Sequence, residues 1–268
     1  KMISTPFLIR LDQDDIALPN RVQEQTNFLS THSSIDVICS WEYIINEKGQ
    51  TIGLYKSKVS NYGEFLTPLF LGLCPIWHPS LACRTNALRE IGGFNDKFKR
   101  AEDFDVTARL ALSRMNASIC QKFHLKVRRH SQQQSNQYKL KQLEVSREVV
   151  SQSISHFVEN EKDSDMLARF FSRRIPLKIL LNEYKLKYLS QVYNSFLKSV
   201  IQNQLLNEIE IKSMKKIISS RVGSGLTYFN RYSALPLHLD LVLFLIFSPR
   251  YILARLLLFL TASINSKN

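Results

Sequence analysis

Cysteine, glycine and proline are all scarce in this chain, and their scarcity narrows the kinds of protein it can be. The four cysteines form no CxxC pair and no other metal-ligand spacing, so we expect reduced thiols in a cytosolic protein. Only 8 glycines and 8 prolines stand beside 44% hydrophobic residues, a balance that excludes a disordered tail. At 268 residues, the chain can bury one good core and something smaller.

Acidic residues are outnumbered by basic ones, which points to an anionic neighbour. The chain holds 36 Lys and Arg against 23 Asp and Glu, with a formal net charge of +13 and a pI near 9.6. A nucleic acid, a phospholipid surface or a phosphorylated substrate would each fit this charge. The basic residues are scattered, and no RNA or DNA motif with interleaved aromatics is visible. We therefore expect no nucleic acid as partner and keep a nucleic-acid-binding basic protein as an alternative.

The pattern of apolar residues divides the chain into three zones. Strand-like and helical runs alternate from residue 7 to about 130, which indicates an α/β fold. From about 137 to 232 the pattern is helical and polar, and from Leu235 to about Ala262 it is the most apolar in the sequence. In the first zone we expect strands in FLIRL, IDVICSWEYII, TIGLY, SLACR and SICQKFHLKV, and helices at about 19–29, 61–72, 85–92 and 102–114.

Three carboxylates, those of Asp12, Asp14 and Asp15, follow the apolar run FLIRL. This run predicts a buried strand, and ligands bind outside the carboxyl ends of the strands in open α/β sheets. Asp12 and Asp14 are two positions apart and can turn toward one cation, and their oxygens suit Mg²⁺ or Mn²⁺. The alternative is that Asp14 or Asp15 only caps the helix that follows.

Four stretches of the sequence together carry a resemblance to a known family. They are LDQDDIALPNRVQEQTNFL, IWHPSLACRTNALREIGGF, RAEDFDVTARLAL and VRRHSQQQS. In order and spacing they resemble the inverting, GT-A fold glycosyltransferases of family 2, in particular the bacterial enzymes that build capsule, exopolysaccharide or lipopolysaccharide O-chains. The resemblance covers roughly residues 5 to 135. It implies an α/β protein with an incomplete GT-A core, Rossmann-like with a mixed sheet, followed by a mainly helical C-terminal region.

The resemblance also implies a domain organisation. Residues 1–135 would be the C-terminal part of the catalytic domain, 136–234 a helical extension and 235–263 an apolar segment at a membrane interface. In this family a nucleotide-binding half precedes the paired acids, and this chain shows no such half and no signal peptide. We expect a C-terminal fragment that is inactive and poorly soluble alone, because the missing strands would leave apolar sheet edges exposed.

The acids take specific roles in the resemblance. Asp12 and Asp14 match the family's DxD pair, which holds a divalent cation, Mn²⁺ or Mg²⁺, on the diphosphate of a nucleotide-sugar. Asp103 matches the catalytic base, which takes the proton from the acceptor hydroxyl as that oxygen attacks the anomeric carbon. Glu102 is its catalytic neighbour and would touch a sugar. The alternative for Glu102 and Asp103 is a plain helix first turn, where the macrodipole favours acids.

Two histidine segments complete the predicted site. His78, Pro79 and Ser80 match a loop that lies beside the donor and acceptor sugars in the family, so they are predicted to bind substrate. His130 matches the histidine that ends the catalytic core near the metal and the diphosphate, where imidazole can ligate or hydrogen-bond. Arg129, directly before it, is predicted to contact phosphate; the alternative is a solvated charge at a strand end.

The implied function is sugar transfer with inversion, from a nucleotide-diphosphate-sugar to a hydroxyl of a saccharide or of a polyprenyl-diphosphate-linked saccharide, in cell-surface polysaccharide synthesis. The chain lacks the QxxRW motif of processive polysaccharide synthases, which favours transfer of single sugars. A non-catalytic membrane-peripheral protein derived from the transferase is a further alternative.

The apolar C-terminal zone raises the question of membrane binding. A bilayer span needs about 20 predominantly apolar residues, and the run here is broken by Ser248-Pro249-Arg250 and contains Arg255. Two short segments in the membrane interface, with both arginines reaching toward lipid phosphates, fit better than a span. The alternative is a pair of core helices. We therefore predict a cytoplasmic protein, peripheral on the inner face of the cell membrane.

Overall fold

The computed structural model describes residues 3–130, 133, 138–172, 184 and 186–229, and the statements below concern these residues. One mixed sheet of six strands has the order β1-β5-β3-β6-β2, with β4 paired to β3. Strands β3 and β6 run parallel, and the remaining described pairs are antiparallel. The strands are β1 Phe7–Ile9, β2 Ile16–Ala17, β3 Val37–Ile45, β4 Thr51–Tyr55, β5 Ala82–Arg84 and β6 Ala117–Arg128.

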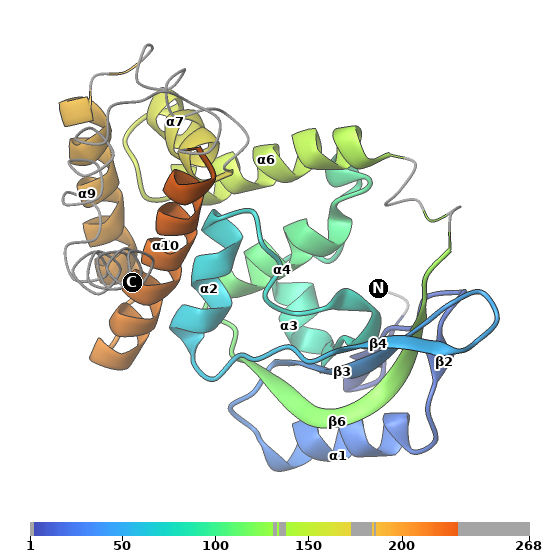
Figure 1. Ribbon diagram of the computed structural model, residues 1–268. Helices are drawn as coiled ribbons and strands as arrows, with labels where there is room; N and C mark the ends of the chain where they lie inside the picture. Colours follow the sequence, from blue (N-terminus) through green and yellow to red (C-terminus); the bar gives the residue numbers. More distant parts are fainter. Residues whose placement is uncertain (1–2, 131–132, 134–137, 173–183, 185, 230–268) are drawn as a thin grey trace, which may run out of the picture.

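Strands β3 and β6 form the centre of the sheet. The sequence of β3, VICSWEYII, is rich in β-branched and aromatic side chains, which suit a pleated and buried surface. The β3–β6 register shifts around Trp41, where β6 contributes extra residues. Such bulges bend a strand and increase its twist, and β6 follows a strong curve across the sheet (Figure 1). Because β6 occupies one edge of β3 along its length, β5 and β4 share the other edge.

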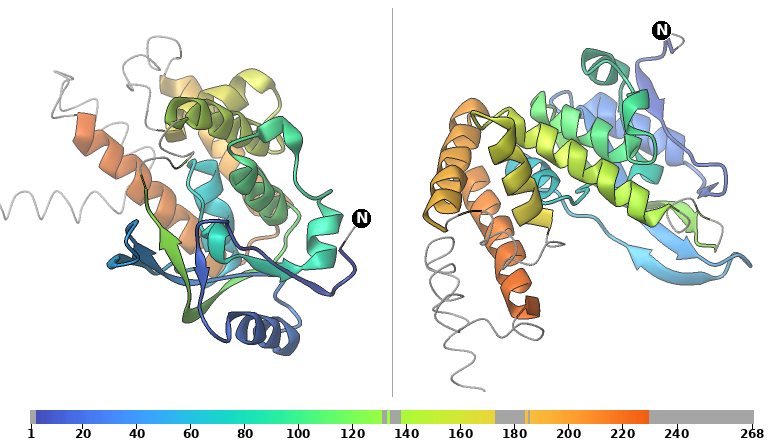
Figure 2. Two further views of the ribbon diagram at one scale, coloured as in Figure 1. Left: turned by 90° about the vertical axis from the view of Figure 1, so that its right-hand side faces the viewer. Right: turned by 90° about the horizontal axis from the view of Figure 1, so that it is seen from above.

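Helices cover both faces of this sheet (Figures 1 and 2). Helix α1, Arg21–Thr31, packs on one face, where its Leu29 contacts a small apolar cluster that includes Ile38 and Cys120. The other helices lie on the opposite side. They are α2 Tyr62–Phe70, α3 Thr85–Glu90, α4 Glu102–Leu112, α6 Lys139–Ser155, α7 Glu161–Ser172, α9 Leu186–Asn203 and α10 Glu208–Phe229, with short 3-10 turns η1 His78–Ser80 and η2 Asp96–Phe98.

A single large apolar core joins the sheet to the helices. It includes Val37 and Cys39 from β3, Phe65 from α2, Phe196 from α9 and Met214 from α10. The fold is therefore a mixed α/β sheet followed by a mainly helical C-terminal region, as the sequence predicts. The proposed boundary at residue 136 stays a prediction, and the segment 235–263 lies outside the described residues. Within the described part, no helix combines the length and the hydropathy that crossing a bilayer requires.

Three details of the predicted elements need correction. FLIRL was expected to be a buried strand, but β1 is three residues long and half-buried, because it lies at the end of the strand order and pairs with β5 alone among the described strands. The helix expected from residue 19 begins at Arg21, because Asn20 adopts a left-handed backbone conformation with φ 65°. Helix α4 ends at Leu112, before Arg114 with its φ of 58°.

Candidate active site

The acidic loop, residues 10–15, leaves the end of β1 and is fixed by its own side chains. Arg10 Nε donates to Asp12 Oδ1 at 2.9 Å. The backbone N–H of Arg10 donates to Leu81 O at 2.9 Å, which ties the start of the loop to the residue that precedes β5. Asp15 Oδ1 accepts from the backbone N–H of Arg128 at 3.0 Å. The three acids are therefore held between the ends of β1 and β6.

Asp14 and His130 meet although they are far apart in the sequence. His130 Nε2 lies 3.0 Å from Asp14 Oδ2. His130 follows the end of β6, and Arg128, the last residue of β6, donates from Nε to Asp14 O at 3.2 Å. The antiparallel pairing of β2 with β6 brings these segments together. The structure thus juxtaposes one predicted DxD carboxylate with the predicted site histidine.

A carboxylate oxygen and an imidazole nitrogen side by side can both face one divalent cation, so Asp14 and His130 fit two positions of a metal site. Asp12 would have to exchange its contact with Arg10 for the cation. Within the described residues, no group of three or more His, Cys, Asp and Glu side chains is arranged to hold a metal ion. The predicted set of Asp12, Asp14 and His130 therefore stays a prediction, with two of its members in contact.

Asp103 lies in the first turn of α4, and charges of the acidic loop change its pKa. Its Oδ1 accepts from the Phe104 N–H at 2.8 Å. Burial raises the pKa of Asp103, the Arg10 guanidinium lowers it and the Asp12 carboxylate raises it. The charges of Arg10 and Asp12 thus act on the α4 carboxylate, and its raised pKa suits a group that accepts a proton.

The other acids of this helix behave differently. Oε2 of Glu102 is buried without a hydrogen-bond partner among the described residues. Asp105 is 3% exposed and binds Arg109 at 2.5 Å within the same helix. Asp105 therefore has a structural role in an ion pair, whereas Oε2 of Glu102 has no hydrogen-bond partner in the described part of the chain.

The HPS loop, His78–Ser80 in η1, contributes a second set of polar groups. His78 is 3% exposed, and neither ring nitrogen has a hydrogen-bond partner within the described residues. Ser80 is fully buried, and its hydroxyl accepts from the Ser40 N–H at 3.1 Å. Pro79 offers its carbonyl oxygen to Arg21 at 3.1 Å. The structure therefore uses Pro79 and Ser80 to fix the loop, whereas the imidazole of His78 is buried and makes no hydrogen bond within the described residues.

Arg129 lies on an aromatic side chain beside the acidic loop. Its guanidinium is 5.2 Å from the centroid of the Trp77 ring, and Trp77 packs edge-on against Tyr55 at 3.8 Å. Arg129 and His130 also line an open hollow with Asn46, Glu47, Lys48, Gln50 and Gln133. Arg129 thus shares this hollow with His130, the partner of Asp14.

Sequence reasoning missed two buried charges behind the acidic loop. Glu42, in the centre of β3, is 0% exposed, and within the described residues neither of its carboxylate oxygens makes a hydrogen bond of ordinary geometry. Burial raises the pKa of Glu42 to about 7, and it raises that of Asp15 to about 6. Arg21, 2% exposed, lies close to both. The only sequence signal was a charged residue inside the apolar run IDVICSWEYII.

Comparisons with known proteins indicate the class of enzyme to which this chain is similar. No family model matches the chain. Two curated proteins that are similar to it are both named as uncharacterized glycosyltransferases, so the similarity relates the chain to glycosyltransferases.

The relatives match only part of their own length. The protein from Methanocaldococcus jannaschii is 29% identical over 122 residues, which is 46% of this chain and 41% of that protein. The protein from Rickettsia felis is 32% identical over 133 residues, 47% of this chain and 21% of that protein. The chain thus matches less than half the length of these relatives. Among solved structures, S. aureus TarS 1–349 in complex with UDP covers 87% of this chain and 69% of its own, with a TM-score of 0.43 and 16% identity.

Proposed function

We propose that this chain forms part of an inverting glycosyltransferase of family 2 with a GT-A type core. It would move a sugar from a nucleotide-diphosphate-sugar to a hydroxyl of a saccharide or a lipid-linked saccharide. The observation that carries the proposal is the contact of Asp14 with His130, which brings two of the predicted site residues together from distant parts of the chain. The charges of Arg10 and Asp12 also act on the pKa of Asp103. The similarity to two proteins named as glycosyltransferases supports the same conclusion.

Asp12, Asp14 and His130 would hold a divalent cation, Mn²⁺ or Mg²⁺. When bound, such a cation neutralises the charge that develops on the leaving nucleoside diphosphate. Arg129 lines the same hollow as His130 and would add a fixed positive charge toward the phosphates. The bound cation and the charge of Arg129 would together stabilise the negative charge of the diphosphate leaving group.

Asp103 would act as the general base. It takes the proton of the acceptor hydroxyl while that oxygen forms a bond to the anomeric carbon, and the bond from this carbon to the diphosphate oxygen breaks on the opposite face. One such displacement inverts the configuration. The pKa of Asp103, raised by burial, makes it a better proton acceptor than an exposed carboxylate.

The remaining predicted residues would bind the sugars. The ring nitrogens of His78 have no partner among the described residues and would donate to and accept from sugar hydroxyls. Oε2 of Glu102, which likewise has no hydrogen-bond partner in the described part of the chain, would accept a hydrogen bond from the acceptor or the donor sugar. Pro79 and Ser80 would contribute through the position of the loop, since the Ser80 hydroxyl is already bonded to Ser40.

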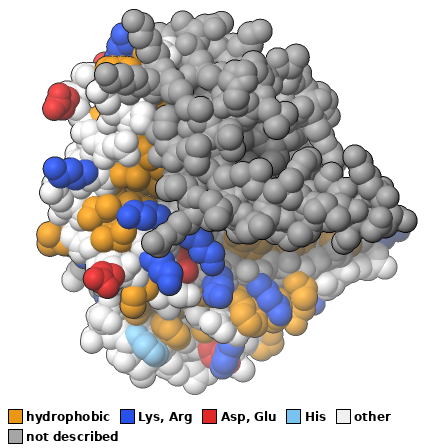
Figure 3. Space-filling view, turned by 60° about the vertical axis from the view of Figure 1, so that its left-hand side comes forward, with side chains coloured by type: hydrophobic (Ala, Val, Ile, Leu, Met, Phe, Trp, Pro, Cys, Tyr) orange, Lys and Arg blue, Asp and Glu red, His pale blue; other side chains and the backbone are white. Residues whose placement is uncertain are grey.

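We further propose a role at the inner face of the cell membrane, in the synthesis of a cell-surface polysaccharide on a polyprenyl-diphosphate-linked acceptor. The net charge of +13 supports an anionic neighbour. On the face shown in Figure 3, Lys and Arg side chains lie among hydrophobic ones, a combination that suits a lipid surface.

The test uses the protein produced from its complete coding sequence. We expect Mn²⁺-dependent hydrolysis of one member of a panel of nucleotide-sugars, and loss of this hydrolysis in Asp14→Ala. Asp96→Asn is the matched control, because Asp96 is an exposed acid in η2, and it should behave like the wild type. Absence of hydrolysis with every donor, together with absence of metal-dependent nucleotide binding, would overturn the proposal.

A further inference from the structure

Arg21 is a buried arginine that the proposed chemistry does not use. It lies at the start of α1 with 2% of its surface exposed. Its Nη2 donates to Arg10 O at 2.5 Å and to Pro79 O at 3.1 Å, and its Nε donates to Gln25 Oε1 at 3.1 Å. One guanidinium group therefore binds two backbone carbonyls from distant parts of the chain.

These two carbonyls belong to the two loops of the candidate site. Arg10 begins the acidic loop that carries Asp12 and Asp14, and Pro79 is the central residue of the HPS loop, next to His78. Arg21 thus bridges the segment that would hold the metal and the diphosphate to the segment that would contact the sugars. A planar guanidinium with its donors in a rigid fork sets the separation of two acceptors, which a flexible ammonium cannot do.

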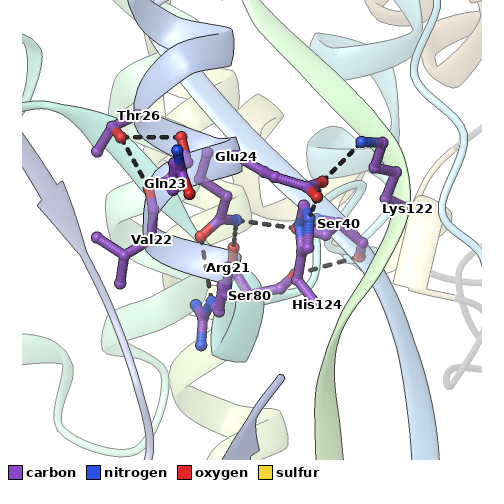
Figure 4. A network of polar contacts seen from close by, with 10 residues as sticks. Arg21, Val22, Gln23, Glu24, Thr26, Ser40, Ser80, Lys122 and His124 are labelled. Atoms are coloured by element: carbon purple, nitrogen blue, oxygen red, sulfur yellow. Dashed lines mark hydrogen bonds and ion pairs between the residues drawn. The ribbon is translucent and has the colours of Figure 1, made fainter. Parts of the chain in front are cut away.

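Gln25, one turn further along α1, supports the same loop. Its Nε2 donates to Ser80 O at 2.8 Å and to Ser40 Oγ at 2.9 Å (Figure 4). Ser40 is also 2.9 Å from His124 Nδ1, and His124 Nε2 lies 3.0 Å from Glu24. The HPS loop therefore rests on a continuous polar network between α1, β3 and β6, and Arg21 extends that network to the acidic loop.

Burying Arg21 requires opposite charge nearby. Burial lowers the pKa of Arg21, and the negative charges of Glu42, Asp15 and Asp12 counter that effect. Glu42 belongs to β3 and Asp15 to the acidic loop. Within the part of the chain that the structure describes, Arg21 makes no direct ion pair, and its Nη2 donates to the two backbone carbonyls instead.

We propose that Arg21 is a positioning residue of the candidate site: its guanidinium holds the acidic loop and the HPS loop at one separation, so that Asp14 and His78 act on the same nucleotide-sugar. This inference rests on the proposed function. It assigns the shape of the site to a side chain on α1 that touches neither the donor nor the reacting atoms.

The test compares Arg21→Lys with Arg84→Lys in the full chain. Arg84 is a matched control because its guanidinium, like that of Arg21, donates to backbone carbonyls. These are the carbonyls of Leu29, His32 and Ile35, at the opposite end of α1. Amide hydrogen exchange measures how firmly the two loops are held, and it needs no ligand. The two reporting amides are the Arg10 N–H, bonded to Leu81 O, and the Leu81 N–H, bonded to His78 O. Turnover of the nucleotide-sugar that the wild type hydrolyses is the second readout.

We expect Arg21→Lys to speed exchange at both of these amides by at least about tenfold. We also expect kcat to fall by about tenfold or more while KM changes little. Arg84→Lys should lower the melting temperature to a similar extent and leave both amides and kcat at wild-type values. Wild-type exchange at Arg10 and Leu81 in Arg21→Lys, or equal loosening of these amides in Arg84→Lys, would overturn the inference.

A second variant covers the case in which Arg21→Lys does not fold. Gln25→Met removes the bond from Gln25 to Ser80 O and the acceptor of Arg21 Nε. It leaves the bond from Arg21 Nη2 to Arg10 O, so exchange should rise at Leu81 and not at Arg10. If both amides loosen equally, Arg21 does not hold the acidic loop independently. A wild type without turnover or metal-dependent nucleotide binding would refute the proposed function, while the exchange results would still show whether Arg21 fixes the two loops.

Discussion

Glu42 and Asp15 show, at the scale of single residues, how burial in the candidate site changes the ionisation of a carboxyl group. Glu42 has no exposed surface, and Asp15 Oδ2 is buried without a hydrogen-bond partner among the described residues. Both carboxyl groups bind their protons more tightly in the folded chain, because burial raises the pKa of Glu42 to about 7 and of Asp15 to about 6. Such groups resist ionisation in the fold and carry a cost in stability when they are charged.

This gives a prediction for the pH dependence of stability. The ordinary pKa of Glu42 is 4.5 and the folded value is about 7, so the folded state holds more protons between these values. The free energy of unfolding should therefore fall as pH rises from 5 to 8. In Glu42→Gln this fall should be smaller, as measured by urea unfolding at four pH values. Glu47→Gln, in the exposed β3–β4 turn, should keep the wild-type slope, and an unchanged slope in Glu42→Gln would contradict the account.

The limits of sequence reasoning are clear at this scale. The sequence could propose Asp12, Asp14, Asp103 and His130 as site residues, because they match motifs of the family that the chain resembles. Arg21 and Glu42 could not, since their burial depends on contacts between α1, β3 and the two loops. The Arg10–Asp12 pair was equally out of reach, because side chains two positions apart in a loop can point to different partners.

At the scale of elements, the close approach of α2 and α10 joins the sheet region to the helical region. A Cβ atom added at Gly63 would lie 2.5 Å from the Glu210 carbonyl oxygen and 2.9 Å from its Cα. Both neighbours are backbone atoms and cannot turn away. Asn61 caps α2 by accepting from the Glu64 N–H at 3.0 Å, and its Nδ2 donates to Ser213 of α10 at 3.1 Å. The two helices thus meet backbone to backbone.

Gly63→Ala should therefore force α2 and α10 apart and lower the free energy of unfolding by about 1–3 kcal/mol, as overpacking does elsewhere. Chemical denaturation measures this change directly. Gly53→Ala on β4 is the control, because its added Cβ would meet only Ile44 at 3.8 Å, an ordinary contact. Equal stability of the two variants would show that the helices do not depend on this close approach.

The central strand matched its prediction from the sequence, whereas the start of α1 and the burial of β1 did not. The strand expected in IDVICSWEYII appears as β3, since its β-branched and aromatic residues suit a central strand. Helix α1 starts later than expected because the left-handed conformation of Asn20 places the helix start after it. The half-buried state of β1 could not be predicted from FLIRL, because burial of a strand depends on its neighbours in the sheet.

At the scale of the whole molecule, one apolar core runs from the sheet into the helical region. Phe196 of α9 contacts Phe70 of α2 at 5.2 Å between ring centroids, and Phe157, after α6, at 6.1 Å. The cluster that holds these rings also includes Val37 of β3. Sheet and helices should therefore stabilise each other and unfold together.

We expect a single unfolding transition with two coincident signals. Trp41 and Trp77 report on the sheet and its neighbouring loop by fluorescence, and far-ultraviolet circular dichroism reports mainly on the helices. Phe196→Ala should shift both signals together, with a loss of about 3–5 kcal/mol. Ile209→Ala, 69% exposed, should shift neither by more than about 0.5 kcal/mol. Two separate transitions would mean that the helical region is an independent unit.

The most direct measurement of the central claim separates binding from chemistry at Asp103. In the protein made from its complete coding sequence, Asp103→Asn should keep the Mn²⁺-dependent affinity for the nucleotide-sugar donor and lower kcat by about 10²–10⁴-fold, the usual effect of losing a general base. Asp14→Ala should instead lose the metal-dependent affinity. An Asp103→Asn variant that turns over at the wild-type rate would contradict the claim that the acidic loop and α4 form one transfer site.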